Sequence, residues 1–167
     1  MRKSDQGIDH HRYCVIPRTL IFIINETSQV LLIKGAPDKT LWSGLYNGIG
    51  GHIEKGENIL EAACRELAEE TGINNINLLF CGQIMVDVTE KTGVSIFIFK
   101  GFYAGEKMKP SHEGTLEWIK LDDLEKLPVV EDLVELLPIL VKHRGKQSPL
   151  IAKYQMDESG KYNYYFN

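Results

Sequence analysis

The chain has 167 residues, of which 43% are hydrophobic and 25% are charged, and its formal net charge is −4. This length and composition suit one globular domain, residues 1–167, that needs no disulfide or structural metal to fold. The acidic balance argues against a broad binding surface for nucleic-acid polymers, because such surfaces need clustered Lys and Arg. An acidic protein that handles phosphates would need a metal ion to mediate.

Cysteine usage and hydropathy indicate where such a protein works. The three cysteines, Cys14, Cys64 and Cys81, lack CxxC spacing, which favours reduced thiols and argues against a zinc site. Residues 1–13 are polar, are expected to be loosely ordered, and contain no apolar core of signal-peptide length. No run approaches the ~18 apolar residues of a membrane span. We therefore expect a cytoplasmic protein with no membrane partner.

Runs of β-branched and alternating apolar residues predict most of a sheet. Residues 15–24 and 29–34 flank a turn-like cluster and are expected to form an antiparallel hairpin. The remaining strands are expected at 76–88, 94–103 and 116–121, followed by a closing hairpin in residues 148–167.

Two helices are expected. The first begins at Asn58, a good N-cap, with Glu61 in the capping-box position, and ends at Gly72, a left-handed C-cap. Its predicted apolar stripe is Leu60, Ala63, Cys64 and Leu67, and the residues expected to face away are Ala62, Glu66, Glu69 and Glu70. The second covers residues 131–143, where Pro138 introduces a kink or resets the boundary. Its predicted apolar stripe is Leu133, Leu136, Leu137 and Leu140.

The first predicted helix contains three glutamates at a regular spacing. Glu66, Glu69 and Glu70 stand at i, i+3 and i+4 and so share one face. Like charges at this spacing cost a helix roughly 0.2–0.5 kcal/mol per pair, a cost that a bound divalent cation would reverse. Hard cations such as Mg²⁺ take oxygen ligands, and a phosphate could complete the site. Just before the helix, the glycine-rich residues 42–51 predict either a loop whose backbone approaches a ligand or a flexible connector.

One segment matches a known family at fixed spacings. Five residues separate Gly51 from Glu57, seven separate Glu57 from Arg65, and Arg65 begins the run Arg-Glu-Leu-x-Glu-Glu-x-Gly-Ile, which ends at Ile73. This pattern resembles the Nudix box and departs from it nowhere. The resemblance implies an α/β (α+β) fold, an α/β/α sandwich with a mixed β-sheet between helices and the box as a loop–helix–loop.

The same resemblance implies metal-dependent hydrolysis of a phosphoanhydride in a nucleoside diphosphate linked to another group, with Mg²⁺, or Mn²⁺ as a substitute, as cofactor. The implied metal ligands are the carbonyl of Gly50 and the carboxylates of Glu66, Glu69 and Glu70, one of which could serve as base. Glu57 and Arg65 are implied to hold the box loop against the helix through an ion pair.

A further acid outside the box often serves as ligand or base in this family. Glu113 is the candidate here, because it lies in the loop before the expected strand at 116–121. The neighbouring His112 is the alternative base, or else a solvated loop residue.

The resemblance extends to the 8-oxo-dGTP diphosphatases, which cleanse the nucleotide pool by hydrolysing oxidised purine nucleoside triphosphates to monophosphate and pyrophosphate. The run Tyr-Asn-Gly-Ile-Gly-Gly at 46–51 resembles their approach to the box, where the Asn, here Asn47, hydrogen-bonds the purine. Glu131 and Asp132 resemble paired acids that read the oxidised base, and the closing hairpin resembles their last strands. From the residues alone, Asn47 could instead serve the loop backbone, and Glu131 and Asp132 could merely cap the second helix.

Two departures from that group concern substrate binding. Val129 stands where a stacking tryptophan is expected, so Trp42 or Tyr46 would have to supply the ring. His52 stands where related enzymes often place a phosphate-binding Lys, and a neutral His would add less charge.

Other activities of the family are alternatives. The runner-up is an ADP-ribose or nucleoside diphosphate sugar diphosphatase, although those relatives tend to carry a proline beyond the box and this chain has none between Gly72 and Lys109. A capped-RNA hydrolase would need a basic stripe, and a non-catalytic nucleotide sensor would be expected to have lost box acids. We therefore expect a monomer or homodimer that acts on a small-molecule nucleotide.

Overall fold

A computed structural model of the chain describes residues 2, 6–7, 9, 11–105, 108–109, 111–143 and 147–166. The elements in chain order are β1 (Cys14–Ile24), β2 (Val30–Gly35), β3 (Tyr46–Asn47), α1 (Ile59–Thr71), β4 (Leu79–Asp87), β5 (Thr92–Phe102), β6 (Gly114–Ile119), the 3-10 helix η2 (Leu121–Lys126), α2 (Leu133–Lys142), β7 (Leu150–Met156) and β8 (Tyr162–Phe166). The prediction that residues 1–13 are loosely ordered falls partly outside the described residues, as does Asn167 at the end of the predicted closing hairpin.

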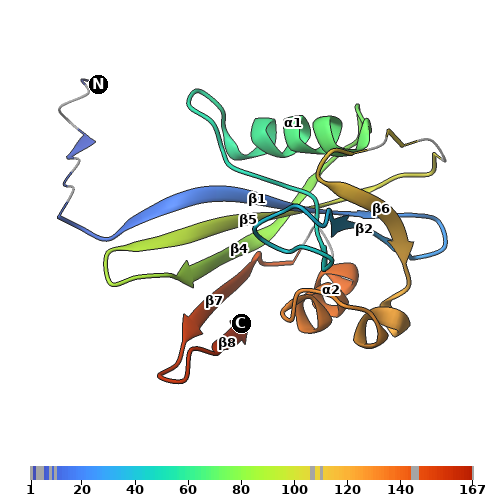
Figure 1. Cartoon of the computed structure of the whole chain (residues 1–167). Coiled ribbons are helices and arrows are strands. Elements are labelled where there is room, and N and C mark those ends of the chain that lie inside the picture. The colour runs from blue at the N-terminus through green and yellow to red at the C-terminus, as the bar shows by residue number, and fades with distance from the viewer. Residues whose placement is uncertain are drawn as a thin grey trace.

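The strands form one eight-stranded sheet in the order β3-β2-β1-β5-β4-β7-β8, and β6 pairs with β2 off this path. β1 runs parallel to β5 and β4 runs parallel to β7, whereas the other paired strands are antiparallel. Helix α1 covers one face of the sheet, while α2 and η2 lie on the other (Figure 1). The structure thus confirms the predicted α/β/α sandwich with a mixed sheet.

The sheet is covered on both faces because side chains alternate along its central strands. In β1, Ile21 and Ile23 belong to the apolar cluster under α1, which also contains Ala63 and Leu67 of that helix. Phe22, between them in the sequence, belongs to the cluster under α2. A strand buried on both faces reads as a continuous apolar run, and this is the pattern that residues 20–24 show.

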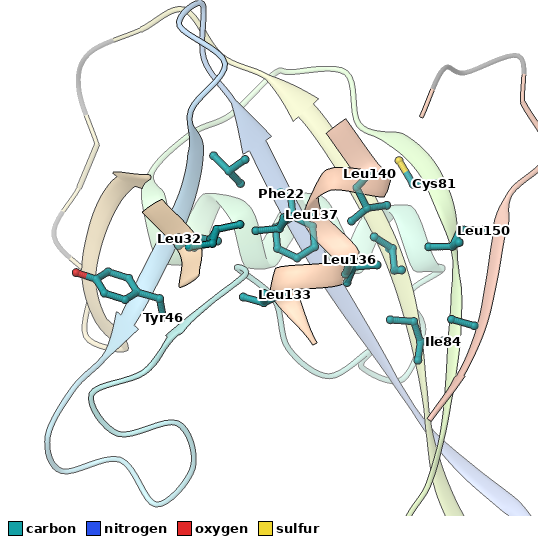
Figure 2. Close-up of a cluster of buried hydrophobic side chains, with 14 of the residues drawn as sticks. Phe22, Leu32, Tyr46, Cys81, Ile84, Leu133, Leu136, Leu137, Leu140 and Leu150 are labelled. Atoms are coloured by element: carbon teal, nitrogen blue, oxygen red, sulfur yellow. The ribbon is translucent and has the colours of Figure 1, made fainter. Parts of the chain in front are cut away.

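The cluster under α2 forms the larger part of the core (Figure 2). Its helical members are the four residues of the predicted stripe, all buried: Leu133, Leu136, Leu137 and Leu140. In Figure 2 they lie over Phe22 and Ile84 of the sheet. Pro138 lies inside α2, so it does not mark a boundary of the helix.

Helix α1 has the predicted caps. The Asn58 side chain accepts hydrogen bonds from the amides of Leu60 and Glu61, and the Glu61 carboxylate accepts one from the Asn58 amide. Gly72 ends the helix in the left-handed conformation, with φ 74°.

The predicted apolar stripe of α1 is partly wrong. Leu60 and Cys64 are exposed, whereas the buried residues are Ala62, Ala63, Leu67, Glu70 and Thr71. The physical reason is the spacing i, i+4, i+7, which places Ala63, Leu67 and Glu70 on one face of a helix. Glu70 therefore points toward the protein interior, not away from it with Glu69.

The predicted hairpins β1–β2 and β7–β8 are present as antiparallel pairs, and the predicted strands β4 and β5 also pair antiparallel. The sequence missed two short elements, β3 and η2, which are too brief to show a periodic pattern. No helix within the described ranges is long and apolar enough to cross a membrane.

Candidate active site

The glycine-rich segment before α1 is held firmly against β1. Ile49 and Ile21 exchange backbone hydrogen bonds of 2.7 and 3.2 Å, and the Thr19 amide donates to the carbonyl of Gly51 at 2.9 Å. Gly50 has φ 147°, and a Cβ on it would lie 2.2 Å from the Thr19 carbonyl oxygen. Only glycine fits such a position. These contacts favour the close-approach interpretation of this loop over the flexible connector.

The first box acid lies directly over this loop. A Cβ added to Gly51 would lie 2.3 Å from Oε1 of Glu66. The absence of a side chain at Gly51 therefore allows the Glu66 carboxylate to approach the loop backbone.

Glu57 and Arg65 form an ion pair between the loop and the helix. Nε of Arg65 donates to Oε1 of Glu57 at 2.6 Å, and Nη2 donates to Oε2 at 3.0 Å. The same Nη2 donates to the carbonyl of His52 at 3.0 Å. The Arg65 guanidinium and the Glu54 amide lower the pKa of Glu57 below its usual value. This two-bond geometry is the strongest form of a carboxylate pair and ties residues 52–57 to α1.

Arg65 also contacts two acids of its own helix, Glu66 and Glu69. Its Nη1 lies 2.9 Å from Oε1 of Glu66 and 3.1 Å from Oε2 of Glu69. One guanidinium therefore relieves part of the repulsion that the two carboxylates would otherwise exert on each other.

Glu70 has a different environment, because it is only 8% exposed. Burial, followed by the negative charges of Glu66 and Glu113, raises the pKa of Glu70 to about 8. The amide of Gly50 and the charge of Lys39 act in the opposite direction. A buried carboxyl group close to two other acids is a strongly perturbed group of the kind found at functional sites.

Glu113 reaches the same region from the loop before β6. Its Oε2 lies 2.5 Å from Nζ of Lys39, with the two side chains 52% and 34% exposed. The Glu113 carbonyl accepts a hydrogen bond from the Ala36 amide at 3.0 Å. His112 is exposed and is not among the residues that line the cavity described next.

Glu70, Lys39 and Glu113 border a cavity of about 560 Å³, whereas the predicted metal ligands Glu66 and Glu69 are not among the residues that line it. The predicted site residues in its wall are Trp42, Asn47, Gly50, Glu70, Glu113 and Asp132. The wall also contains residues that sequence reasoning missed, among them Thr19, Lys39, Tyr154, Tyr162 and Tyr164. The alternation Tyr-x-Tyr in β8, which places Tyr162 and Tyr164 on one face, is a signal that could have found two of them.

Thr19 adds an unsatisfied polar group to this wall. It is 3% exposed, and its Oγ1 is buried without a hydrogen-bond partner among the described residues. Buried hydroxyl groups nearly always have a partner, so this atom is suited to contact a bound molecule.

Three predicted substrate contacts do not lie in the cavity wall. Tyr46 is 4% exposed and belongs to the core cluster, at one end of the group drawn in Figure 2. Its ring therefore cannot stack on a base in the cavity, which leaves Trp42 as the predicted ring that borders it. His52 and Glu131 are exposed, and neither lines the cavity.

Asn47 has a local partner. Its Oδ1 accepts a hydrogen bond from the Gly48 amide at 2.8 Å, so the oxygen serves the loop backbone. Its side-chain nitrogen has no hydrogen-bond partner within the described part of the chain, and it is the group left for a ligand.

Asp132 precedes α2, but its side chain makes no capping hydrogen bond. Instead, Tyr154 donates from its hydroxyl group to Oδ2 of Asp132 at 2.9 Å, and Asp132 is only 8% exposed. Burial raises the pKa of Asp132 to about 6, and the bond from Tyr154 opposes that rise. The side chain of Asp132 therefore does not cap the helix and binds Tyr154 instead.

A divalent cation would suit the oxygens at the Glu70 side of the cavity. Carboxylate and carbonyl oxygens are the ligands that hard cations take, and Glu70 is buried beside the charges of Glu66 and Glu113. Within the described ranges, no three His, Cys, Asp or Glu side chains already surround a common centre. Arg65 contacts Glu66 and Lys39 contacts Glu113, so a cation bound by these two carboxylates would have to replace these partners.

The family model for the NUDIX domain matches residues 16–139, a range that contains both the acidic helix and the cavity wall up to Asp132. This chain belongs to the Nudix family. It is accordingly a Nudix hydrolase, and residues 51–73 form its Nudix box.

Individual Nudix relatives differ in what their names say they act on. The chain is 29% identical over 149 residues to the oxidized purine nucleoside triphosphate hydrolase of Danio rerio, covering 84% of this chain and 93% of that one. It is 25% identical to the NAD-capped RNA hydrolase NudC of Pseudomonas aeruginosa, covering 84% of this chain but 50% of NudC. Its fold is similar to that of the MutT protein from Bacillus halodurans, with a TM-score of 0.71, 27% identity, and coverage of 92% and 98% of the two chains.

Proposed function

We propose that this Nudix hydrolase cleaves a phosphoanhydride of nucleoside triphosphates, releasing nucleoside monophosphate and pyrophosphate, and that oxidised purine nucleotides such as 8-oxo-dGTP are its substrates. One observation carries the proposal: the same cavity has Glu70 and Glu113 in its wall together with Asn47 and Asp132. Its volume of about 560 Å³ is within the usual range for small-molecule sites.

The backbone of residues 46–51 connects the two halves of the site. At one end, Tyr46 hydrogen-bonds with Pro128 and Val130, just before Asp132. At the other end, the backbone of Gly50 lies close enough to the Glu70 carboxyl group to act against the rise of its pKa. A nucleotide that follows this segment can place its base near Asp132 and its phosphates near Glu70.

The base half supplies one amide, one carboxylate and several rings. The Asn47 side-chain nitrogen can donate to a purine acceptor, and the Asp132 carboxylate can accept from a purine donor. Trp42, Tyr162 and Tyr164 border the cavity and offer aromatic surface to a base.

The phosphate half supplies oxygen atoms that can serve as metal ligands, and the cationic side chains Arg18 and Lys39 also line the cavity. In our proposal, Glu66, Glu69, Glu70, Glu113 and the Gly50 carbonyl hold Mg²⁺, or Mn²⁺ in its place. When bound, the metal would neutralise the polyphosphate and activate the attacking water. Glu70 or Glu113 would accept the proton of that water.

The experiment is a turnover screen of the purified full-length chain with Mg²⁺ and resolved products. The substrates are ordinary and oxidised purine triphosphates, ADP-ribose, nucleotide sugars and NAD-capped RNA. We expect selective release of monophosphate and pyrophosphate from oxidised guanine nucleotides. A preference for ADP-ribose, a nucleotide sugar or capped RNA would overturn the substrate proposal, and no turnover of any of them would favour a non-catalytic sensor.

A further inference from the structure

Tyr154 of β7 makes a buried contact that the proposed function does not use. It is 5% exposed, it lines the cavity, and its hydroxyl group donates to Oδ2 of Asp132 at 2.9 Å. The bond joins the closing hairpin to the segment before α2, two parts of the chain that are separated by 22 residues. A buried hydrogen bond to a carboxylate is among the stronger neutral-to-charged contacts in proteins.

The position of this hydroxyl group is fixed by packing. The Tyr154 ring meets the Tyr164 ring edge to face, with centroids 4.7 Å apart, and meets Phe166 in the same way at 6.0 Å. Tyr154 and Tyr164 are direct partners in the β7–β8 register. Because the ring belongs to a paired strand and not to a loop, its hydroxyl group holds Oδ2 of Asp132 in one place.

Tyr154 also opposes the other influences on Asp132. Burial and the neighbouring charge of Glu131 both favour the protonated acid, whereas the hydrogen bond from Tyr154 favours the carboxylate. Tyr164 of β8 and Glu135 of α2 are further titratable groups on this side, and both act on Tyr154. Tyr154 is therefore the side chain that, together with the backbone of Asp132 itself, favours Asp132 as an acceptor.

We propose that Tyr154 is a specificity-determining positioning residue: it holds Asp132 as a hydrogen-bond acceptor, so that the cavity selects purine edges that donate over edges that accept. A guanine-type edge donates from N1 and from its exocyclic amine, and can pair with a carboxylate. An adenine-type edge presents an acceptor at N1, which a carboxylate repels but a protonated acid can bind. The inference rests on the proposed function, because it places the base beside Asp132.

The test compares Tyr154→Phe with the matched control Tyr165→Phe. Tyr165 lies in the same hairpin, is 55% exposed and lines a different groove, so its hydroxyl group does not reach Asp132. The readout is the ratio of kcat/KM for guanine-type over adenine-type deoxynucleoside triphosphates, ordinary and oxidised, with Mg²⁺ between pH 5 and 9. We expect Tyr154→Phe to lower this ratio at least about tenfold, and Tyr165→Phe to leave it within about twofold.

A merely structural role would lower kcat/KM for both bases alike and leave the ratio and its pH profile unchanged. We expect instead that the acidic limb of the guanine-type profile moves to higher pH in Tyr154→Phe. A double-mutant cycle with Asp132→Asn provides the second readout: if Tyr154 acts through Asp132, Tyr154→Phe has no effect on the ratio in the Asp132→Asn background.

The outcomes separate this inference from the proposed function. If the wild-type chain turns over no purine triphosphate, the proposed function fails and the inference fails with it. If the wild-type chain turns them over and Tyr154→Phe keeps the same base ratio, only the inference is overturned. An equal loss from Tyr154→Phe in both Asp132 backgrounds also overturns it.

Discussion

Replacement of Asp132 by Asn tests whether the cavity wall contains a buried ionisable group. Asp132 is 8% exposed, and burial raises its pKa from 3.8 to about 6 in the folded chain. An acid whose pKa is higher in the folded state stabilises the fold below its unfolded pKa, and this contribution is lost as the pH rises through the folded pKa. Asn has a similar shape and does not ionise, so Asp132→Asn lacks this loss.

The size of the effect follows from the shift. One pKa unit corresponds to about 1.36 kcal/mol. A rise of about two units therefore means that ionised Asp132 lowers the free energy of unfolding of the wild-type chain by roughly 3 kcal/mol above pH 6. Roughly a third of that loss falls between pH 4 and 5, and nearly half of it, somewhat more than about 1 kcal/mol, falls between pH 5 and 8. The stability of Asp132→Asn relative to wild type should therefore increase by about 1 kcal/mol over this range.

The assay is urea unfolding of both proteins at pH 5, 6.5 and 8, followed by circular dichroism. Asp122→Asn, at an exposed position of η2, is the matched control and should show no comparable slope. Only the change with pH is decisive, because the Asn amide adds a constant term of its own. A difference that is flat from pH 5 to 8, or that falls, would refute the argument that Asp132 is a desolvated carboxyl group.

Three further changes test the box, the core and the loop. Glu70→Gln should lower Mg²⁺-dependent kcat at least about 100-fold, because it replaces a buried carboxyl group that we assign to metal binding or base catalysis; steady-state kinetics measures this. Leu137→Ala should destabilise the fold by about 2–5 kcal/mol, since Leu137 is fully buried; urea unfolding measures this. Gly50→Ala should lower both Tm and kcat/KM, because its Cβ would lie 2.2 Å from the Thr19 carbonyl oxygen; thermal unfolding and kinetics measure this.

Each of these has its own control. Cys64→Ser, at an exposed position of α1, should retain wild-type turnover. Unchanged turnover in Glu70→Gln would show that the acids of α1 do not form the catalytic site. Ile139→Ala, at a position of α2 that is 37% exposed, should cost less than Leu137→Ala, and equal costs would contradict the described packing. A fully active and stable Gly50→Ala would mean that the loop does not lie against β1 as described.

Local patterns in the sequence predicted the fold well. The caps of α1 at Asn58 and Gly72 are confirmed, because capping depends on residues only two to four positions apart. The apolar stripe of α2 is confirmed as well. The predicted stripe of α1 is partly wrong, because small residues such as Ala62 give no strong apolar signal and an acidic side chain such as that of Glu70 is normally expected to face solvent.

The candidate site could be predicted only in part. Asn47 and Asp132 do line the cavity with Glu70 and Glu113, whereas Tyr46 lies in the core. An aromatic residue beside an Asn-Gly pair is equally consistent with a stacking ring and a buried one, and only its neighbours in three dimensions distinguish the two.

The Nudix box can be identified from the sequence, because the spacing of Gly51, Glu57 and Arg65 with the acids that follow is a local property, which a loop and one helix translate directly into geometry. Which groups line the cavity depends instead on the tertiary structure. Asp132 meets Tyr154, and Glu113 meets Lys39, because the sheet places β7 beside β4 and β6 beside β2. The order of strands in the sheet sets these contacts, and no spacing along the chain encodes that order.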